Sequence, residues 1–215
     1  MHQIHHTEGI VIKKIDSGEA DLFITILSKD FGKFSLFAKG GKKISAKIAP
    51  HLDILNKSEI SFVQGKNFAR ATSALTLNYF ENLKSDFRRI IAGFFAMELA
   101  DQAIEENAPI KKEYEEVQLF LEKLDSCKES KINYLPYIFS ARFLAALGYN
   151  PQLCGQQNNE TKLLRVCLEY GYDIIDKIDL SSADIRRLRV ILDKPLLQII
   201  RAPLNTWKIL ENVVK

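Results

Sequence analysis

The spacing of hydrophobic residues changes once along this chain, near residue 80, and this change limits the possible folds more than any other feature. Before it, short runs rich in β-branched and aromatic residues alternate with polar or turn-forming stretches, as in β-strands. Five such runs are predicted as strands: 9–14, 21–28, 33–39, 58–63 and 68–77. After it, hydrophobic residues recur at helical spacing. We therefore predict an α+β protein in which a small β-barrel precedes a set of helices.

Turn-forming residues between the predicted strands support this interpretation. Residues 29–32 (KDFG) and 64–67 (QGKN) each place a glycine in a short connection, as expected for hairpins. Five strands are the number found in an oligonucleotide-binding (OB) barrel. Strand number alone does not distinguish an OB barrel from an SH3-like barrel.

The predicted helices begin and end at recognisable residues. Ser85 is predicted to cap a long amphipathic helix that continues to about Ile104 and stops before Pro109. Two further helices are predicted over 114–124 and 134–147. These segments indicate a helical domain that follows the barrel.

The C-terminal third is less regular. The polar stretch 155–162 is predicted as a surface loop. Ser182 is predicted to cap a helix, and Pro195 and Pro203 are expected to separate the remaining short helical pieces. The acids of the second helix are predicted to form a solvated face rather than a metal site. They are Glu113, Glu115, Glu116 and Glu122.

Positive charge is concentrated in the first third of the chain. The formal net charge is only +3, but residues 1–80 carry 11 Lys and Arg against 7 Asp and Glu, and residues 81–215 carry 19 against 20. Five lysines lie between Asp30 and Asp53 with no acid among them. They are Lys33, Lys39, Lys42, Lys43 and Lys47. Such a cluster favours binding of a polyanion.

Alternation along the third predicted strand separates two faces. Phe34, Leu36 and Ala38 share the face expected to enter the barrel core. The opposite face is predicted to combine an aromatic ring with two cations; its residues are Lys33, Ser35, Phe37 and Lys39.

An aromatic ring beside cations suits single-stranded DNA, because bases stack on the ring and the cations follow the phosphates. Phe68 and Arg70, which share one face of a later strand, could extend this surface. The alternative is that Phe37 and Phe68 pack beneath the helical domain, as apolar residues on the outside of a small docked barrel often do.

The segment after the third strand, residues 39–47 (KGGKKISAK), is predicted to be an exposed basic loop. Lys39, Lys42, Lys43 and Lys47 could neutralise phosphates without a fixed geometry. Alternatively, these lysines only keep the loop soluble. The segment lacks the pattern of a nucleotide-binding P-loop, so nucleotide hydrolysis has no support.

No arrangement of residues predicts catalysis, a metal or another cofactor. His2, His5 and His6 lie at a terminus that is expected to fray, with no acid or thiol at matching spacing. Cys127, Cys154 and Cys167 are odd in number and widely spaced, as expected for reduced thiols. No secretory signal or membrane-spanning run is recognisable, so we expect a cytoplasmic protein. Because no catalytic arrangement is recognisable either, we expect that the protein is not an enzyme.

Arg142 is unusual because it lies on an otherwise apolar predicted helix, near Phe139, Phe143 and Leu144. Its side chain could reach solvent from the edge of the core. Alternatively, it could anchor an anion beside an apolar groove.

Several segments resemble the RecO family of bacterial recombination mediators. EGIVIK (8–13), GEAD (18–21), FGK (31–33) and AKG (38–40) follow one another as in that family. LGYNPQL (147–153) is similar to its LGY-x-P-x-L segment, again after a helix-rich stretch. The resemblance covers most of residues 8–155.

The resemblance implies a five-stranded OB-type barrel over 1–80 and an α-helical domain over 81–215. It implies a protein that binds single- and double-stranded DNA, anneals complementary strands and, with RecR, helps RecA replace single-strand-binding protein (SSB). By position, Lys39, Lys42, Lys43 and Lys47 become the leading DNA contacts. Arg142 becomes a candidate contact for the acidic C-terminal tail of SSB, which would suit a groove with one cation at its mouth.

The chain departs from the family pattern at one place. Many members continue after LGY-x-P-x-L with a four-cysteine zinc module, and Cys154 stands at the start of that region. Residues 155–162 supply no second thiol, and Cys167 is the only later one. We therefore predict that the zinc module is lost.

Two other functions remain open on the sequence. An OB barrel could bind RNA, since stacking and phosphate contacts do not distinguish the two polymers without a group that reads the 2′-hydroxyl. Alternatively, the chain could be a docking adaptor in which the helical half carries the function. In that case, charge reversal at Lys42 and Lys43 would leave nucleic-acid binding unchanged.

Overall fold

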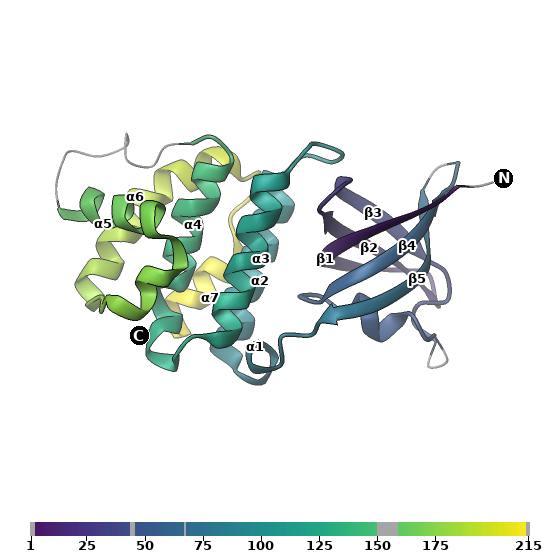
Figure 1. Cartoon of the computed structure of the whole chain (residues 1–215), viewed down its shortest axis with the longest axis horizontal. Helices are drawn as coiled ribbons and strands as arrows, with labels where there is room; N and C mark the ends of the chain where they lie inside the picture. Colours follow the sequence, from purple (N-terminus) through teal and green to yellow (C-terminus); the bar gives the residue numbers. More distant parts are fainter. Residues whose placement is uncertain (1–2, 44–45, 67, 150–158, 214–215) are drawn as a thin grey trace. The chain divides into compact units, whose positions relative to one another are not determined.

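The N-terminal part of the chain forms a closed five-stranded barrel in the order β1-β2-β3-β5-β4 (Figure 1). The computed structural model describes residues 3–43, 46–66, 68–149 and 159–213. The strands are β1 (Ile4–Ser17), β2 (Asp21–Ser28), β3 (Gly32–Ala38), β4 (Lys57–Gln64) and β5 (Ala69–Asn78). A short 3-10 helix, η1 (Ala49–Leu52), lies between β3 and β4. The predicted α+β class with an OB-type barrel is confirmed.

Hairpin pairing and one parallel contact close the barrel. β2 pairs antiparallel with β1 and β3, and β4 pairs antiparallel with β1 and β5. Closure comes from a short parallel contact between β3 and β5, in which Leu36 faces Ala69 and Phe37 faces Arg70. Phe37 and Arg70, which are far apart in the sequence, therefore lie side by side on the barrel.

The barrel core contains the residues that alternation predicted. Phe34, Leu36 and Ala38 are buried and pack with inward residues of the other strands, such as Ile24 and Ile60. Phe37 lies between Leu36 and Ala38 and therefore points outward, because side chains alternate between the two faces of a strand.

Contacts between residues divide the chain into a barrel unit and a helical unit. One segment from the middle of the chain belongs to the barrel unit. The barrel unit extends to Phe80 and also includes Ile104–Tyr114. The Asn107 backbone N–H donates to the Lys33 carbonyl oxygen at 2.9 Å. A Cβ on Gly32, whose φ is +74°, would lie 2.2 Å from the Ala108 carbonyl oxygen, so the close approach requires glycine. Residues 104–114, assigned from sequence to the helical domain, therefore pack on the barrel.

The helical unit contains Glu81–Ala103 and the chain from Glu115 onward. Its helices are α1 (Glu81–Ser85), α2 (Phe87–Ala103), α3 (Lys111–Ser126, of which the first turn lies in the barrel unit), α4 (Leu135–Ala146), α5 (Asn159–Tyr170), α6 (Ser182–Ile199) and α7 (Asn205–Val213), with 3-10 helices η2 (Glu129–Tyr134) and η4 (Gly171–Lys177) (Figure 1).

The core of the helical unit is built around α4. This helix packs against α2, α5 and α6 and is buried on most of its surface. Phe139 on α4 lies 4.4 Å from Phe120 and 6.3 Å from Phe95, measured between ring centroids. A helix that is apolar all round is expected at such a central position.

Several local predictions in the helical region are wrong. The carboxylate of Asp86 accepts from the backbone N–H groups of Arg88 and Arg89, so Asp86 caps α2, and the Ser85 hydroxyl donates to the Asn82 carbonyl oxygen instead. Ser181, not Ser182, caps α6 through a reciprocal pair of hydrogen bonds with Asp184.

Pro195 was expected to separate helical pieces, but it is buried inside α6, which continues to Ile199. The predicted loop over 155–162 also needs correction, because α5 begins at Asn159. Residues 155–158 lie outside the described part of the chain.

No helix in the described parts of the chain is long and apolar enough to cross a membrane. Within the same residues, no group of three His, Cys, Asp or Glu side chains lies close enough to hold a metal ion. Cys127 and Cys167 are buried free thiols, and burial raises the pKa of Cys167 to about 11. Cys154, which heads the region of the family's zinc module, lies outside the described residues.

Candidate nucleic-acid interface

Three phenylalanines form an aromatic cluster on the outer face of the barrel. Phe23 on β2 faces Phe37 on β3 in the strand register, and their ring centroids are 5.2 Å apart. Phe68, in the β4–β5 connection, meets Phe23 edge-to-face at 5.1 Å. Phe68 is 52% exposed, so an aromatic ring is open to solvent here. We call Phe23, Phe37 and Phe68 the aromatic cluster.

Two hollows flank this cluster on the barrel surface, and Phe23 and Phe68 line both. The first, about 330 Å³ in volume, also contains Lys66 and Arg70, and we call it the cationic compartment. The second, about 530 Å³, is lined by further phenylalanines and by uncharged polar groups and one acid, and we call it the polar compartment. Together they form a groove across β2 and β3, the surface on which OB folds commonly bind oligonucleotides.

The walls of the polar compartment come from a second group of aromatic side chains. Phe31 lies 5.2 Å from Phe62, and Phe62 lies 5.0 Å from Phe34. His5 stacks on Phe62 at 5.3 Å. Phe31 is 38% exposed, whereas Phe34 and Phe62 belong to the barrel core. The compartment therefore opens directly above the core.

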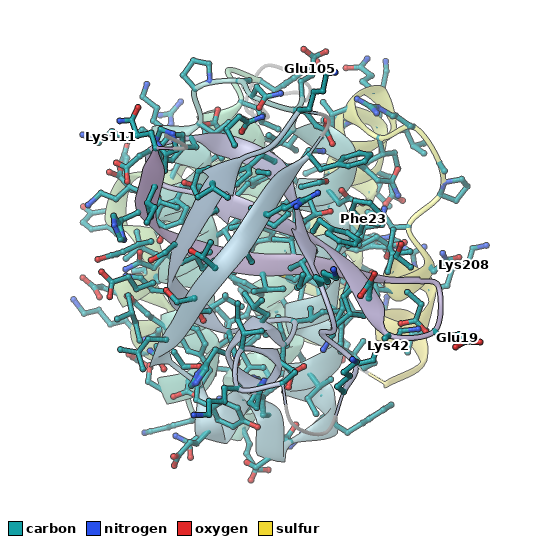
Figure 2. All side chains as sticks on the ribbon, turned by 90° about the vertical axis from the view of Figure 1, so that its right-hand side faces the viewer. Glu19, Phe23, Lys42, Glu105, Lys111 and Lys208 are labelled. Atoms are coloured by element: carbon teal, nitrogen blue, oxygen red, sulfur yellow. The ribbon has the colours of Figure 1, made fainter. Side chains whose placement is uncertain are left out.

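The basic segment after β3 lies beside the turn between β1 and β2. The Lys42 ammonium is 2.9 Å from a carboxylate oxygen of Asp16 and donates to the Gly18 carbonyl oxygen at 3.0 Å. The Lys42 backbone N–H donates to the Ala20 carbonyl oxygen at 2.9 Å. Figure 2 labels Lys42 and its neighbour Glu19 on the same side of the barrel as Phe23. The charge of Lys42 is thus partly balanced by Asp16.

The other lysines predicted in this segment are exposed; they are Lys39, Lys43 and Lys47. Residues 44–45 of the same loop lie outside the described part of the chain. Arg70, opposite Phe37 across the β3–β5 contact, is exposed as well. The structure therefore brings Phe37, Phe68 and Arg70 together, as the strand alternation suggested.

The comparison with known proteins agrees with this geometry. Residues 1–80 match the family model described as Recombination protein O N terminal, and residues 84–159 match the model described as Recombination protein O C terminal. The chain belongs to the RecO family.

Individual RecO relatives match most of this chain but not all of their own length. "DNA repair protein RecO" of Roseiflexus sp. (strain RS-1) is 32% identical over 151 residues, which is 70% of this chain and 52% of that protein. The protein of the same name from Acetivibrio thermocellus is 32% identical over 177 residues, or 81% of this chain and 65% of the relative. The protein of the same name from Thermodesulfovibrio yellowstonii is 32% identical over 165 residues, which is 74% of this chain and 64% of the relative. The matches thus span between about half and two thirds of these relatives.

Strand alternation did not place every predicted contact correctly. Lys33 was predicted on the outer, DNA-binding face, but it is only 4% exposed. Residues 104–114 cover this end of β3, where Lys33 forms a parallel bridge with Glu106 and its carbonyl oxygen accepts from Asn107. The prediction of Lys33 as an exposed contact is therefore wrong.

Arg142 has a partner inside the helical unit. Its guanidinium forms two hydrogen bonds with the carboxylate of Glu116, one of them at 2.8 Å, and lies over the ring of Tyr172 at 5.1 Å. Both side chains of this ion pair are 14% exposed. Although burial opposes it, the Glu116 carboxylate raises the pKa of Arg142. An open anchor at Arg142 is therefore wrong, as is an outward, solvated Glu116.

The terminal histidines are also more ordered than predicted. His5 and His6 lie within β1 and pair with Phe62 and Ser61 of β4. The ring of His6 forms a hydrogen bond with the Ser61 hydroxyl at 2.9 Å. These histidines therefore contribute to the barrel, while His2 lies outside the described residues.

Among the residues that line the groove, sequence reasoning missed several, including Phe23, Phe31, Lys66 and Glu106. Phe23 could have been found by applying the alternation rule to β2, since Leu22 and Ile24 enter the core on either side of it. Lys66 lies in the predicted hairpin connection next to Phe68. Phe31 carried no comparable signal, because its position depends on contacts with Phe62.

Proposed function

We propose that this chain acts in DNA repair and binds single-stranded DNA in the groove across β2 and β3. The main observation that supports this proposal is the aromatic cluster, which lies beside Lys66 and Arg70. Bases stack on exposed aromatic rings with about 1–3 kcal/mol each, and every base has a face that can stack. The cations attract the phosphates and make binding depend on salt.

The names of the relatives, DNA repair protein RecO, support the same role for this chain. From the family resemblance, we propose that it also binds double-stranded DNA, anneals complementary strands and works with RecR to help RecA replace SSB. Contact with the acidic tail of SSB is part of this proposal, but Arg142 is not its anchor. The chain works by binding and positioning DNA, without catalysing a reaction.

Charge reversal in the cationic compartment tests the proposal. Arg70→Glu places an acid next to Phe37, so the affinity for a fluorescein-labelled 15-nucleotide DNA strand should fall at least about tenfold. Fluorescence anisotropy measures this affinity. Lys111→Glu makes the same change of charge at an exposed residue of the barrel unit outside the groove, on the opposite side from Phe23 in Figure 2.

The control variant should bind nearly as tightly as the unmodified protein. Equal losses in Arg70→Glu and Lys111→Glu would mean that only overall charge matters, and would contradict a site in this groove. Competition with an RNA strand of the same sequence then decides between DNA and RNA.

Strand annealing on SSB-coated DNA tests the finer proposal. The unmodified chain with RecR should accelerate annealing, and Arg70→Glu should lose this effect. Tight binding of bare DNA without any annealing would support the groove and contradict the mediator role.

A further inference from the structure

The two compartments of the groove differ in charge. Lys66 and Arg70 line the cationic compartment. Among the described residues that line the polar compartment, there is no lysine or arginine. Its polar groups are Thr25, Ser35, Gln64, Glu106 and Asn107. A negatively charged backbone would therefore be attracted to one side of the aromatic cluster and repelled from the other.

Glu106 is held at this position by the barrel unit itself. It forms a parallel bridge with Lys33, and the next residue, Asn107, donates its backbone N–H to the Lys33 carbonyl oxygen at 2.9 Å. The close contact between Gly32 and Ala108 fixes the same segment two residues further on. The backbone that carries Glu106 thus belongs to a fixed wall of the polar compartment.

The polar compartment has the size and the walls of a nucleobase site. Its volume of about 530 Å³ lies within the range of small-ligand pockets. Phe31 offers an exposed ring at one wall, and Phe23 and Phe68 form another. A base that leaves the stack on the aromatic cluster can enter here, while its phosphates remain beside Lys66 and Arg70.

The carboxylate determines which bases fit. An ionised carboxylate only accepts hydrogen bonds, so it pairs with the exocyclic amino group of cytosine, adenine or guanine. Uracil and thymine present a carbonyl oxygen at the position where cytosine has its amino group, and this oxygen is repelled by the carboxylate.

We infer that the polar compartment is a base-selective subsite in which Glu106 accepts a hydrogen bond from the amino group of an unstacked base. This inference rests on the proposed DNA binding. It predicts that the protein prefers strands rich in bases that carry an amino group.

Binding of two labelled 15-nucleotide strands, oligo(dC) and oligo(dU), tests the inference. Cytosine has an amino group where uracil has a carbonyl oxygen, and uracil carries a proton on the neighbouring ring nitrogen. The two bases are otherwise the same. Fluorescence anisotropy at neutral pH should give an affinity for oligo(dC) that is at least about tenfold higher, as expected for a hydrogen bond to a charged group. In Glu106→Gln the ratio of the two affinities should fall to near one, because the side-chain amide can donate to the uracil oxygen.

Glu105→Gln is the matched control. Glu105, which is labelled in Figure 2, is exposed and precedes Glu106 in the same segment. It does not line either compartment. The Glu105→Gln variant loses the same charge as Glu106→Gln but keeps the carboxylate of Glu106. Its ratio of affinities for oligo(dC) and oligo(dU) should therefore equal that of the unmodified protein. Thermal unfolding of both variants, followed by circular dichroism, should match the unmodified protein because both side chains are exposed.

Two results would overturn the inference while leaving the proposed function intact. The first is tight binding of both strands with equal affinity, and the second is an unchanged preference for oligo(dC) in Glu106→Gln. Failure of the unmodified protein to bind either strand would instead contradict the proposed function, and the inference with it.

Discussion

Phe37 shows how the strand alternation places a functional side chain. Its neighbours Leu36 and Ala38 enter the barrel core, so Phe37 must face outward, where it meets Phe23 and Arg70. Phe37→Ala removes one stacking surface and should cost about 1–3 kcal/mol of binding free energy for single-stranded DNA. The salt dependence of binding should stay unchanged because no charge is lost.

Anisotropy titrations at several salt concentrations measure both quantities. Phe87→Ala, which removes a 63% exposed phenylalanine from α2, is the control and should bind normally. An equal loss in both variants would contradict a specific stacking role for Phe37.

The ion pair between Glu116 and Arg142 belongs to the stability of the helical unit. Glu116→Ala leaves the Arg142 guanidinium without its charge partner among groups that are largely buried. Breaking a buried pair costs several kcal/mol, and because 14% of each side chain is exposed we expect about 2–3 kcal/mol of unfolding free energy here. Urea unfolding measures this loss, and an unchanged stability would contradict the internal role.

At the residue scale, the sequence predicts inward and outward positions well and long-range partners poorly. Phe37, Phe68 and Arg70 were identified because alternation depends only on neighbouring residues. Lys33 and Arg142 were misplaced because their burial depends on residues 104–114 and on Glu116, which lie far along the chain.

At the scale of elements, α2 shows how a helix start can be misassigned by one residue. Ser85 and Asp86 are both good capping residues, and only the backbone geometry shows that Asp86 accepts from Arg88 and Arg89. Although burial opposes it, these hydrogen bonds and the nearby Arg88 side chain lower the pKa of Asp86.

Asp86→Ala should therefore cost about 1 kcal/mol at neutral pH, whereas Ser85→Ala should change stability by less than about 0.5 kcal/mol. A carboxyl with a lowered folded-state pKa stabilises above its usual titration range, and this contribution is lost as pH falls through the folded-state value. The difference between Asp86→Ala and the unmodified protein should therefore disappear in strongly acidic buffer. Urea unfolding followed by circular dichroism tests both statements, and a larger cost for Ser85→Ala would contradict the assignment.

The strands were easier to predict than the helix ends. Four of the five β-strands begin and end within one residue of the predicted runs, because turn residues flank each run. The exception is β1 (Ile4–Ser17), which extends beyond the predicted run 9–14 at both ends. Pro195 misled the helix prediction because α6 tolerates it in its last turns. Element type was thus predictable, and element boundaries depended on contacts.

At the scale of the whole molecule, the groove depends on two contacts that no local pattern encodes. One is the short parallel pairing of β3 with β5, which places Arg70 beside Phe37. The other is the packing of residues 104–114 on the barrel, which adds Glu106 and Asn107 to the groove. Composition and family resemblance indicated a DNA-binding barrel, but only the fold separates its cationic and polar compartments.

The most direct test of the account is hydrogen–deuterium exchange of the full chain, measured by mass spectrometry with and without a single-stranded DNA of mixed sequence. We predict slower exchange in peptides that cover β2, β3 and residues 64–70, because bound DNA would cover the groove between them. Slower exchange confined to residues 115–213, with the barrel peptides unchanged, would contradict the account.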